Sequence, residues 1–258
     1  MSQVILSLIF GALIGFSLGL LGGGGSILTV PILVYVIGQD VHAATGTSLA
    51  IVGGSALLGA FAHSRSGDVR INSGLVFGLM SMISAIPGVW LNRLVAGKTI
   101  LLLFAFLMLA VAMDMLRKKT AERQLQTAGM PCEAYTRMDW LRLLALGLVV
   151  GLLTGFFGVG GGFLIVPALV LVGNFPTRQA VGTSLLIIAM ASVSGFLGHL
   201  SFGTVDLTIV GLFDFGGLGG VLSGTALAGR VPEQKLAKAF GWFTIIVALY
   251  LIYENLLR

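Results

Sequence analysis

Charged residues and cysteines are scarce in this sequence, and both absences limit what the protein can be. Asp, Glu, Lys and Arg make up 10% of its 258 residues, against about 25% in an average soluble domain. The single cysteine, Cys132, excludes an intramolecular disulfide and a cysteine metal cluster. The chain is instead 57% hydrophobic, with a mean hydropathy of +1.03. We therefore expect an integral membrane protein without a metal or a permanent cofactor.

The net charge of +5 does not by itself indicate a nucleic acid partner. Basic residues gather beside apolar segments, where Lys and Arg set the orientation of a membrane protein. The expected partner is thus the lipid bilayer, and no nucleic acid binding is expected.

Long apolar segments predict membrane-spanning helices. Those at 4–21, 43–62, 73–92 and 99–116 approach or reach the ~20 residues that a helix needs to span ~30 Å of hydrocarbon. The strands of a membrane barrel would show short alternating segments instead. The predicted fold class is an all-α polytopic helix bundle. Because Met1-Ser-Gln3 lacks a basic n-region, we expect the first segment to remain in the mature protein.

A glycine-rich break interrupts the apolar sequence twice. Residues 19–31 read GLLGGGGSILTVP, and residues 155–167, 136 positions later, read GFFGVGGGFLIVP. Each glycine in a helix interior costs about 1 kcal/mol relative to Ala. Broken backbone inside a bilayer is tolerated only where protein buries it or a watery cavity lines it. The doubled break therefore predicts a binding site.

The repeat extends well beyond the breaks. At the same offset of 136, Gly11, Gly15 and Gly19 match Gly147, Gly151 and Gly155, and His63 matches His199. Two related halves are therefore predicted, at 1–116 and 140–258, joined by a polar linker at 117–139. The apolar segment 27–37 is too short to span, which favours a re-entrant half-helix after each break.

The distribution of Lys and Arg favours inverted halves. If each half crosses the membrane three times, twelve of these residues lie on the side of the linker and three on the other side. With four crossings per half the halves are parallel, and the numbers become nine and six. Inverted repeats with a cytoplasmic linker are therefore predicted.

Inverted repeats with broken helices are typical of secondary transporters, which bind substrate near the midplane. Half-helices that begin after Gly25 and Gly162 would present free N–H groups and a positive dipole end to a small anion. The triplets Gly46-Thr47-Ser48 and Gly182-Thr183-Ser184 are predicted to cap the helices that follow them. The alternative is that the glycines only pack and the hydroxyls only cap. The candidate substrate-binding residues are Gly22, Gly24, Gly25, Ser26, Thr47, Ser48, Gly158, Gly160, Gly161, Gly162, Thr183 and Ser184.

Three ionisable residues are candidates for coupling or gating. His63 and His199 lie at the ends of helices, where a direct role competes with a simple interfacial position. Asp214 lies within an apolar segment, and an alignment with one gap pairs it with Phe77. A carboxylate in the membrane is a functional hypothesis by default. The alternative is a neutral carboxyl held in a glycine-lined interface.

The doubled break, running from Gly22 to Pro31 and from Gly158 to Pro167 and followed each time by Gly-Thr-Ser, resembles the TauE/SafE family of sulfite exporters. The resemblance covers nearly the whole chain. It implies export of small sulfur-containing anions, such as sulfite or organosulfonates, through a bacterial inner membrane, driven by an ion gradient such as that of protons or sodium. One departure is that Ser26 stands where its partner is Gly162.

Other functions remain open at this point. A carrier of small carboxylates or other oxyanions would use the same helix starts, because these recognise charge rather than the atom that bears it. An anion channel would also use paired breaks, and only dependence of flux on an ion gradient separates the two. An enzyme is disfavoured, because the sequence has no Gly-x-Ser-x-Gly and no His-Glu-x-x-His motif.

Overall fold

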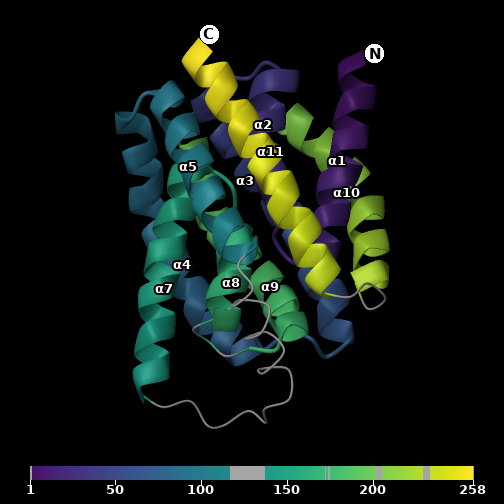
Figure 1. Cartoon of the computed structure of the whole chain (residues 1–258), viewed down its shortest axis with the longest axis vertical. Coiled ribbons are helices and arrows are strands. Elements are labelled where there is room, and N and C mark those ends of the chain that lie inside the picture. The colour runs from purple at the N-terminus through teal and green to yellow at the C-terminus, as the bar shows by residue number, and fades with distance from the viewer. Residues whose placement is uncertain are drawn as a thin grey trace.

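The computed structural model describes residues 2–116, 137–171, 173, 175–201, 205–228 and 233–257 (Figure 1). Most of the predicted linker, at 117–136, lies outside these residues. The described chain is helical and contains no strand. Six of its helices, α1, α3, α4, α7, α9 and α10, are long and apolar enough to cross a membrane. The predicted class of an all-α polytopic membrane protein is confirmed.

The helices of the first half are α1 (Ser2–Leu21), α2 (Ser26–Pro31), α3 (Val41–Arg65), α4 (Ile71–Leu94) and α5 (Gly97–Leu116), with a π-helical turn η1 (Ile32–Val36) after α2. Those of the second half are α7 (Arg137–Phe157), α8 (Gly162–Leu171), α9 (Thr177–Leu200), α10 (Leu207–Ala228) and α11 (Glu233–Leu257).

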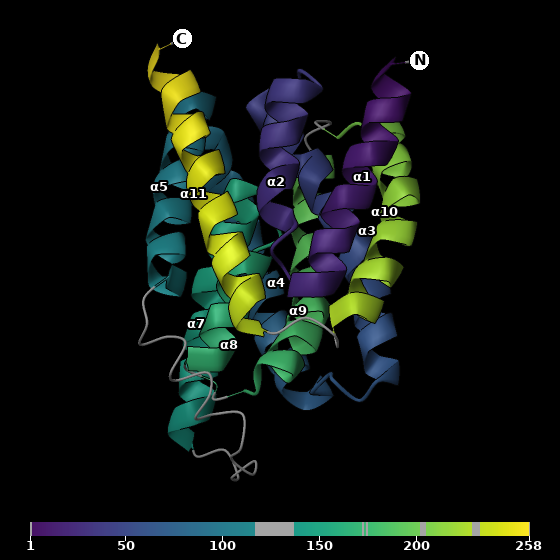
Figure 2. The ribbon, with the colours of Figure 1, turned by 45° about the vertical axis from the view of Figure 1, so that its right-hand side comes forward.

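The two halves take opposite paths through the molecule (Figure 2). From the N-terminus α1 descends to mid-height, α2 returns upward, and α3, α4 and α5 then run down, up and down. From the lower end α7 rises, α8 returns downward, and α9, α10 and α11 run up, down and up. Both termini consequently lie at the upper end of the molecule in this view.

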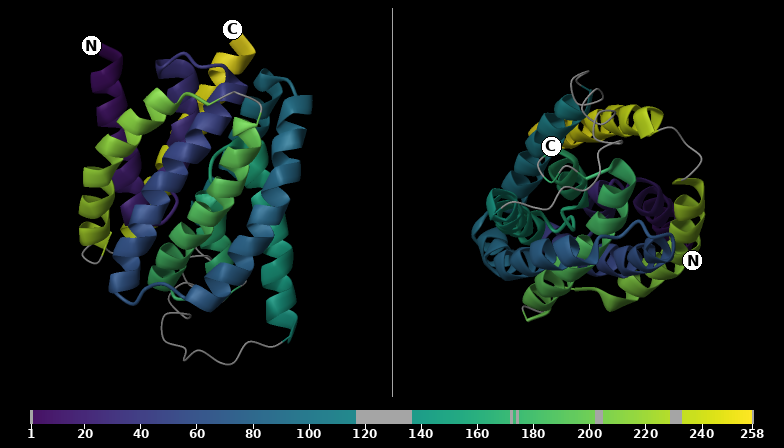
Figure 3. Two further views of the ribbon diagram at one scale, coloured as in Figure 1. Left: turned by 180° about the vertical axis from the view of Figure 1, so that it is seen from behind. Right: turned by 90° about the horizontal axis from the view of Figure 1, so that it is seen from below.

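Small residues line the helix contacts between the two halves. Gly11 and Gly15 of α1 face α10, where a Cβ on Gly15 would lie 2.5 Å from the carbonyl oxygen of Gly217. Gly147 of α7 faces α4, and its Cβ would lie 2.9 Å from the carbonyl oxygen of Phe77. Figure 3 shows these two helix pairs on opposite sides of the bundle. Such spacing of small residues lets the helix backbones approach closely, so α1 docks on the second half and α7 on the first.

The most deeply buried spanning helices, α3 and α9, pack against each other at the centre of the bundle. Gly53 of α3 faces Ser192 of α9, and Gly195 of α9 faces Leu49 of α3. The outer surface carries large apolar side chains, among them Leu94 and Phe215, which are 81% and 72% exposed. Exposed apolar residues of this size fit contact with lipid rather than with water.

Candidate functional site

Both breaks leave the helix in the same way. Gly22 and Gly158 follow the last residues of α1 and α7 with φ angles of 70° each. Their backbone N–H groups donate to the carbonyl oxygens of Leu18 and Thr154, at 2.8 and 2.9 Å. Only glycine adopts such a left-handed conformation without strain. All the glycines of both breaks are buried, so the chain turns back inside the protein.

The two breaks touch each other. A Cβ on Gly162 would lie 2.6 Å from the Cα of Gly23, and a Cβ on Gly23 would lie equally close to the Cα of Gly162. Gly25 needs its small size for another reason, because a Cβ there would collide with the carbonyl oxygen of Ile14 and lie 2.9 Å from the N–H nitrogen of Leu18. Gly23 and Gly162, 139 positions apart in the sequence, are thus brought together backbone to backbone.

Helices α3 and α9 flank the breaks in matching positions. A Cβ on Gly158 would lie 2.5 Å from the Cα of Thr45 in α3, and a Cβ on Gly22 would lie 2.7 Å from the Cα of Val181 in α9. Thr45 and Val181 are themselves 136 positions apart. The central helix of each half therefore covers the break of the other half.

The prediction that the Gly-Thr-Ser triplets cap their own helices is wrong. Helix α3 begins at Val41, where the Asp40 carboxylate accepts from the His42 N–H at 3.0 Å, and α9 begins at Thr177. The triplets at 46–48 and 182–184 lie inside these helices and are buried. The true starts come earlier because Asp40 and Pro176 supply the local signals that end the preceding loops.

The two threonine hydroxyls instead bond to the other half. Thr183 Oγ1 accepts from the backbone N–H of Arg70 at 3.0 Å, and Thr47 Oγ1 accepts from that of Asp206 at 3.3 Å. Arg70 and Asp206 directly precede α4 and α10. Each threonine thus satisfies a donor at the start of a helix more than 100 residues away.

The serines of the two triplets differ in their partners. Ser184 Oγ donates to the carbonyl oxygen of Gly22 at 2.5 Å and contacts that of Val181 at 2.7 Å. Ser26 Oγ likewise donates to the carbonyl oxygen of Gly23 at 2.7 Å. Ser48 is fully buried, and its hydroxyl has no hydrogen-bond partner among the described residues. Ser184 and Ser26 are therefore hydrogen-bonded to the backbone of the first break, whereas Ser48 has no such bond.

Both predicted histidines are buried against the last turn before a break. His63 Nε2 donates to the carbonyl oxygen of Gly19 at 3.2 Å, and His199 is hydrogen-bonded to the backbone of Gly155. Both side chains are buried inside the protein, with exposures of 3% and 1%.

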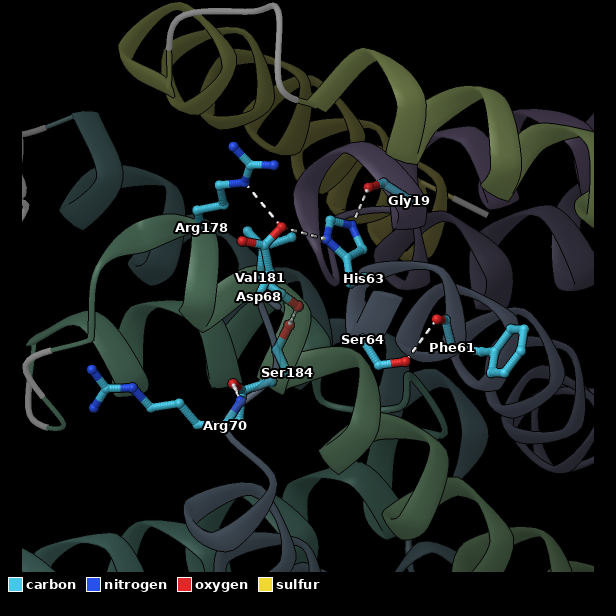
Figure 4. Close-up of polar contacts among 10 residues, drawn as sticks. Gly19, Phe61, His63, Ser64, Asp68, Arg70, Arg178, Val181 and Ser184 are labelled. Carbon is cyan, nitrogen blue, oxygen red and sulfur yellow. Dashed lines mark hydrogen bonds and ion pairs between the residues drawn. The ribbon is translucent and has the colours of Figure 1, made fainter. Parts of the chain in front are cut away.

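A charged pair next to His63 was not anticipated from the sequence. Asp68 Oδ2 accepts from Arg178 Nε at 2.9 Å and lies 3.7 Å from His63 Nδ1 (Figure 4). These groups come from the end of α3, the loop that follows it and the start of α9. Asp68 and Arg178 are more than 100 residues apart in the sequence, so no local pattern could have paired them.

Asp214 lies in α10 against the middle of α3. A Cβ on Gly54 would lie 2.7 Å from Asp214 Oδ2, and Oδ1 is buried without a hydrogen-bond partner in the described part of the chain. The structure corrects the pairing of Asp214 with Phe77. Gly11 contacts the carbonyl of Phe213, and Gly147, which is 136 positions after Gly11, contacts the carbonyl of Phe77. The counterpart of Phe77 is therefore Phe213, again at an offset of 136. At this offset the counterpart of Asp214 is Gly78, so the carboxylate belongs to one half alone.

The comparisons with known proteins agree with this architecture. The family described as "Sulfite exporter TauE/SafE" matches residues 7–251. A "Probable membrane transporter protein" of Xylella fastidiosa is 38% identical over 259 residues, covering 98% of this chain and 96% of that protein. The "Probable membrane transporter protein YunE" of Bacillus subtilis is 31% identical over 276 residues, covering 99% of each.

A shorter match reaches a plant protein. The "Sulfite exporter TauE/SafE family protein 5" of Arabidopsis thaliana is 34% identical over 115 residues, which are 43% of this chain and 24% of that protein. No solved structure matches the chain. Since the family match and the bacterial relatives span nearly the whole sequence, the chain belongs to the TauE/SafE family of membrane transporters.

Proposed function

We propose that this transporter exports a small sulfur oxyanion, sulfite or an organosulfonate, across the bacterial inner membrane. The observation that carries the proposal is the buried contact between the two breaks at Gly23 and Gly162, with α8 starting at that contact. A helix start in a dry interior stabilises negative charge, because its N–H groups and dipole point at the ligand. The name of the family and that of its plant member support sulfite as the substrate.

The two halves act as inverted repeats around this site. Contacts at Gly22 and Gly158, and hydrogen bonds at Thr47 and Thr183, recur in both directions with an offset of 136. Inverted halves of this kind alternate access by moving against each other around a central site. The linker at 117–139 then lies in the cytoplasm and both termini lie on the opposite side.

Export against a concentration difference needs a coupled ion, a proton or sodium. Asp214 is the carboxylate best placed for this role, since it lies beside the centre of α3 with one oxygen unpartnered. His63 and His199 adjoin the ends of α1 and α7, where movement of a break would alter their contacts. In this proposal the protein is a coupled carrier, and flux that does not depend on an ion gradient would instead indicate an anion channel.

Anion-dependent stabilisation of the detergent-purified protein tests the substrate. A ligand that binds the folded state raises its apparent stability by mass action. We expect sulfite or a sulfonate such as taurine or sulfoacetate to raise the unfolding temperature, while sulfate, thiosulfate, acetate and chloride have less effect. A response to acetate alone would identify a carboxylate carrier instead, and an absence of any response would remove small anions as ligands.

A further inference from the structure

The two breaks are similar in sequence but unequal in their buried polar groups. Three hydroxyls border the second break, those of Ser48, Thr154 and Ser192, and all three residues are at most 1% exposed. None of the three has a hydrogen-bond partner among the described residues. A buried hydroxyl without a partner costs free energy, and such groups call for an explanation such as a missing ligand.

Thr154 and Ser192 flank two consecutive glycines of the second break. A Cβ on Gly161 would collide with Thr154 Oγ1, and a Cβ on Gly160 would lie 3.5 Å from Ser192 Oγ. These glycines have φ angles of 66° and 68° and lead directly into α8, a helix of ten residues. Both hydroxyls therefore adjoin the N-terminal end of α8.

Ser48 approaches the same break from α3. Thr45 contacts Gly158, and Val52 contacts Gly160, where a Cβ would lie 2.5 Å from Val52 Cγ1. Residues 45, 48 and 52 share one face of a helix, because they are spaced three and four apart. Ser48 thus lies along the break, between the two points at which α3 touches it.

The first break lacks this arrangement. At the offset of 136, the counterparts of Thr154 and Ser192 are Leu18 and Ala56, which are apolar and fully buried. The counterpart of Ser48 is Ser184, whose hydroxyl already bonds to the carbonyl oxygen of Gly22. The three positions whose hydroxyls are unpartnered at the second break are thus apolar or hydrogen-bonded at the first, where the unpartnered hydroxyls among the described residues are those of Thr29 in α2, a helix of only six residues, and of Thr225 beside Gly19.

We propose that the anion binds at the second break alone, held by the hydroxyls of Ser48, Thr154 and Ser192 at the start of α8. This inference rests on the proposed function and specifies which half of the pseudo-symmetric site takes the substrate. Three hydroxyl donors match the three terminal oxygens of a sulfite ion or a sulfonate group, whereas a carboxylate offers two. The first break then serves as the packing partner against which the loaded break moves.

The test is a sulfite titration of the full-length protein in detergent, followed by thermal unfolding, with Thr154→Val and Ser192→Ala variants. Loss of one hydrogen bond to an anion weakens binding roughly tenfold or more. Each variant should weaken the apparent affinity for sulfite by that factor. Without sulfite each variant should unfold at an equal or higher temperature, because an unpartnered buried hydroxyl has been removed. Methanesulfonate and acetate are then compared as ligands. Both variants should prefer methanesulfonate over acetate less strongly than the unmodified protein does.

Thr29→Val is the matched control. Thr29 is fully buried in α2, and its hydroxyl also has no partner in the described chain. Sulfite should stabilise this variant as it stabilises the unmodified protein. Unchanged sulfite affinity in Thr154→Val and Ser192→Ala would overturn the inference. A loss of sulfite affinity in Thr29→Val as large as in these two variants would overturn it too. Either result would leave the proposed function standing. If one variant fails to fold, Ser48→Ala takes its place. An unmodified protein that no sulfur oxyanion stabilises would overturn both proposals.

Discussion

Gly23 and Gly162 lie backbone against backbone at the point where the two breaks meet, with the Cβ position of Gly162 only 2.6 Å from the Cα of Gly23. No anion can lie between these two residues in this conformation. A ligand at the breaks therefore binds beside their contact, and its passage requires the breaks to shift against each other. Packed interfaces of this kind switch between discrete arrangements rather than deforming continuously.

A bulky residue at Gly161 should abolish transport. Gly161 has a φ of 66°, and a Cβ there would collide with Thr154 Oγ1, so Gly161→Val combines backbone strain with a steric clash. We expect flux in vesicles to fall to background. Gly25→Val should have the same effect, because its side chain would clash with the backbone of α1. The control is Gly211→Val, because a Cβ on Gly211 meets nothing within 4 Å. Normal flux in a well-expressed Gly161→Val protein would exclude the second break as the site.

Asp214→Asn should uncouple transport from its driving ion. The substitution keeps the size of the side chain but removes the group that can carry a proton or hold a cation. We expect exchange of sulfite across the vesicle membrane to persist, while accumulation driven by a proton or sodium gradient disappears. Asp206→Asn serves as the control, because Asp206 is exposed and its carboxylate caps α10, a role that Asn also fills. Gradient-driven accumulation by Asp214→Asn at the normal rate would remove this residue from coupling.

Asp68→Asn should destabilise the protein in a salt-dependent manner. Asp68 is bonded to Arg178 and lies near His63, but the Arg178 side chain is 60% exposed, so solvent screens the pair. A loss of about 1 kcal/mol at most is expected, which corresponds to a fall of roughly 2–4 °C in the unfolding temperature for a chain of this size. The difference from the unmodified protein should shrink at high salt. A difference that is independent of salt would show that Asp68 acts through packing rather than charge.

Reporter fusions should place both termini on the same side of the membrane, opposite the linker. A reporter that is active only in the cytoplasm should be silent at the N-terminus and at the C-terminus, and active when inserted in the linker at 117–139. In the proposed inverted arrangement each half crosses the membrane three times, which places the N-terminus and the C-terminus on the same side. Cytoplasmic activity at either terminus would contradict the inverted arrangement.

The spacing of residues in the sequence anticipated much of the fold. Apolar segments of ~20 residues indicate spanning helices whatever their neighbours are, and glycines spaced four apart indicate a close helix contact. The offset of 136 also anticipates pairs such as Thr47 and Thr183, although not what they bind. Their donors, at Asp206 and Arg70, belong to the other half and carry no local signal.

The site was harder to predict than the fold. The Gly-Thr-Ser triplets had the composition of a helix cap, but Asp40 and Pro176 start these helices several residues earlier. Thr154 and Ser192 were missed because a lone hydroxyl in an apolar helix is common. Only the packing shows that both adjoin Gly160 and Gly161 without a partner of their own. Comparison with the apolar counterparts Leu18 and Ala56 would have been the one available signal in the sequence.

Sulfite flux in vesicles that contain only the purified protein tests the central claim most directly. The account predicts saturable movement of radiolabelled sulfite that unlabelled sulfite or a sulfonate inhibits, that chloride does not inhibit, and that Gly161→Val abolishes. Flux no greater than in empty vesicles, or flux that acetate inhibits as well as sulfite does, would contradict the assignment of this transporter to sulfur oxyanions.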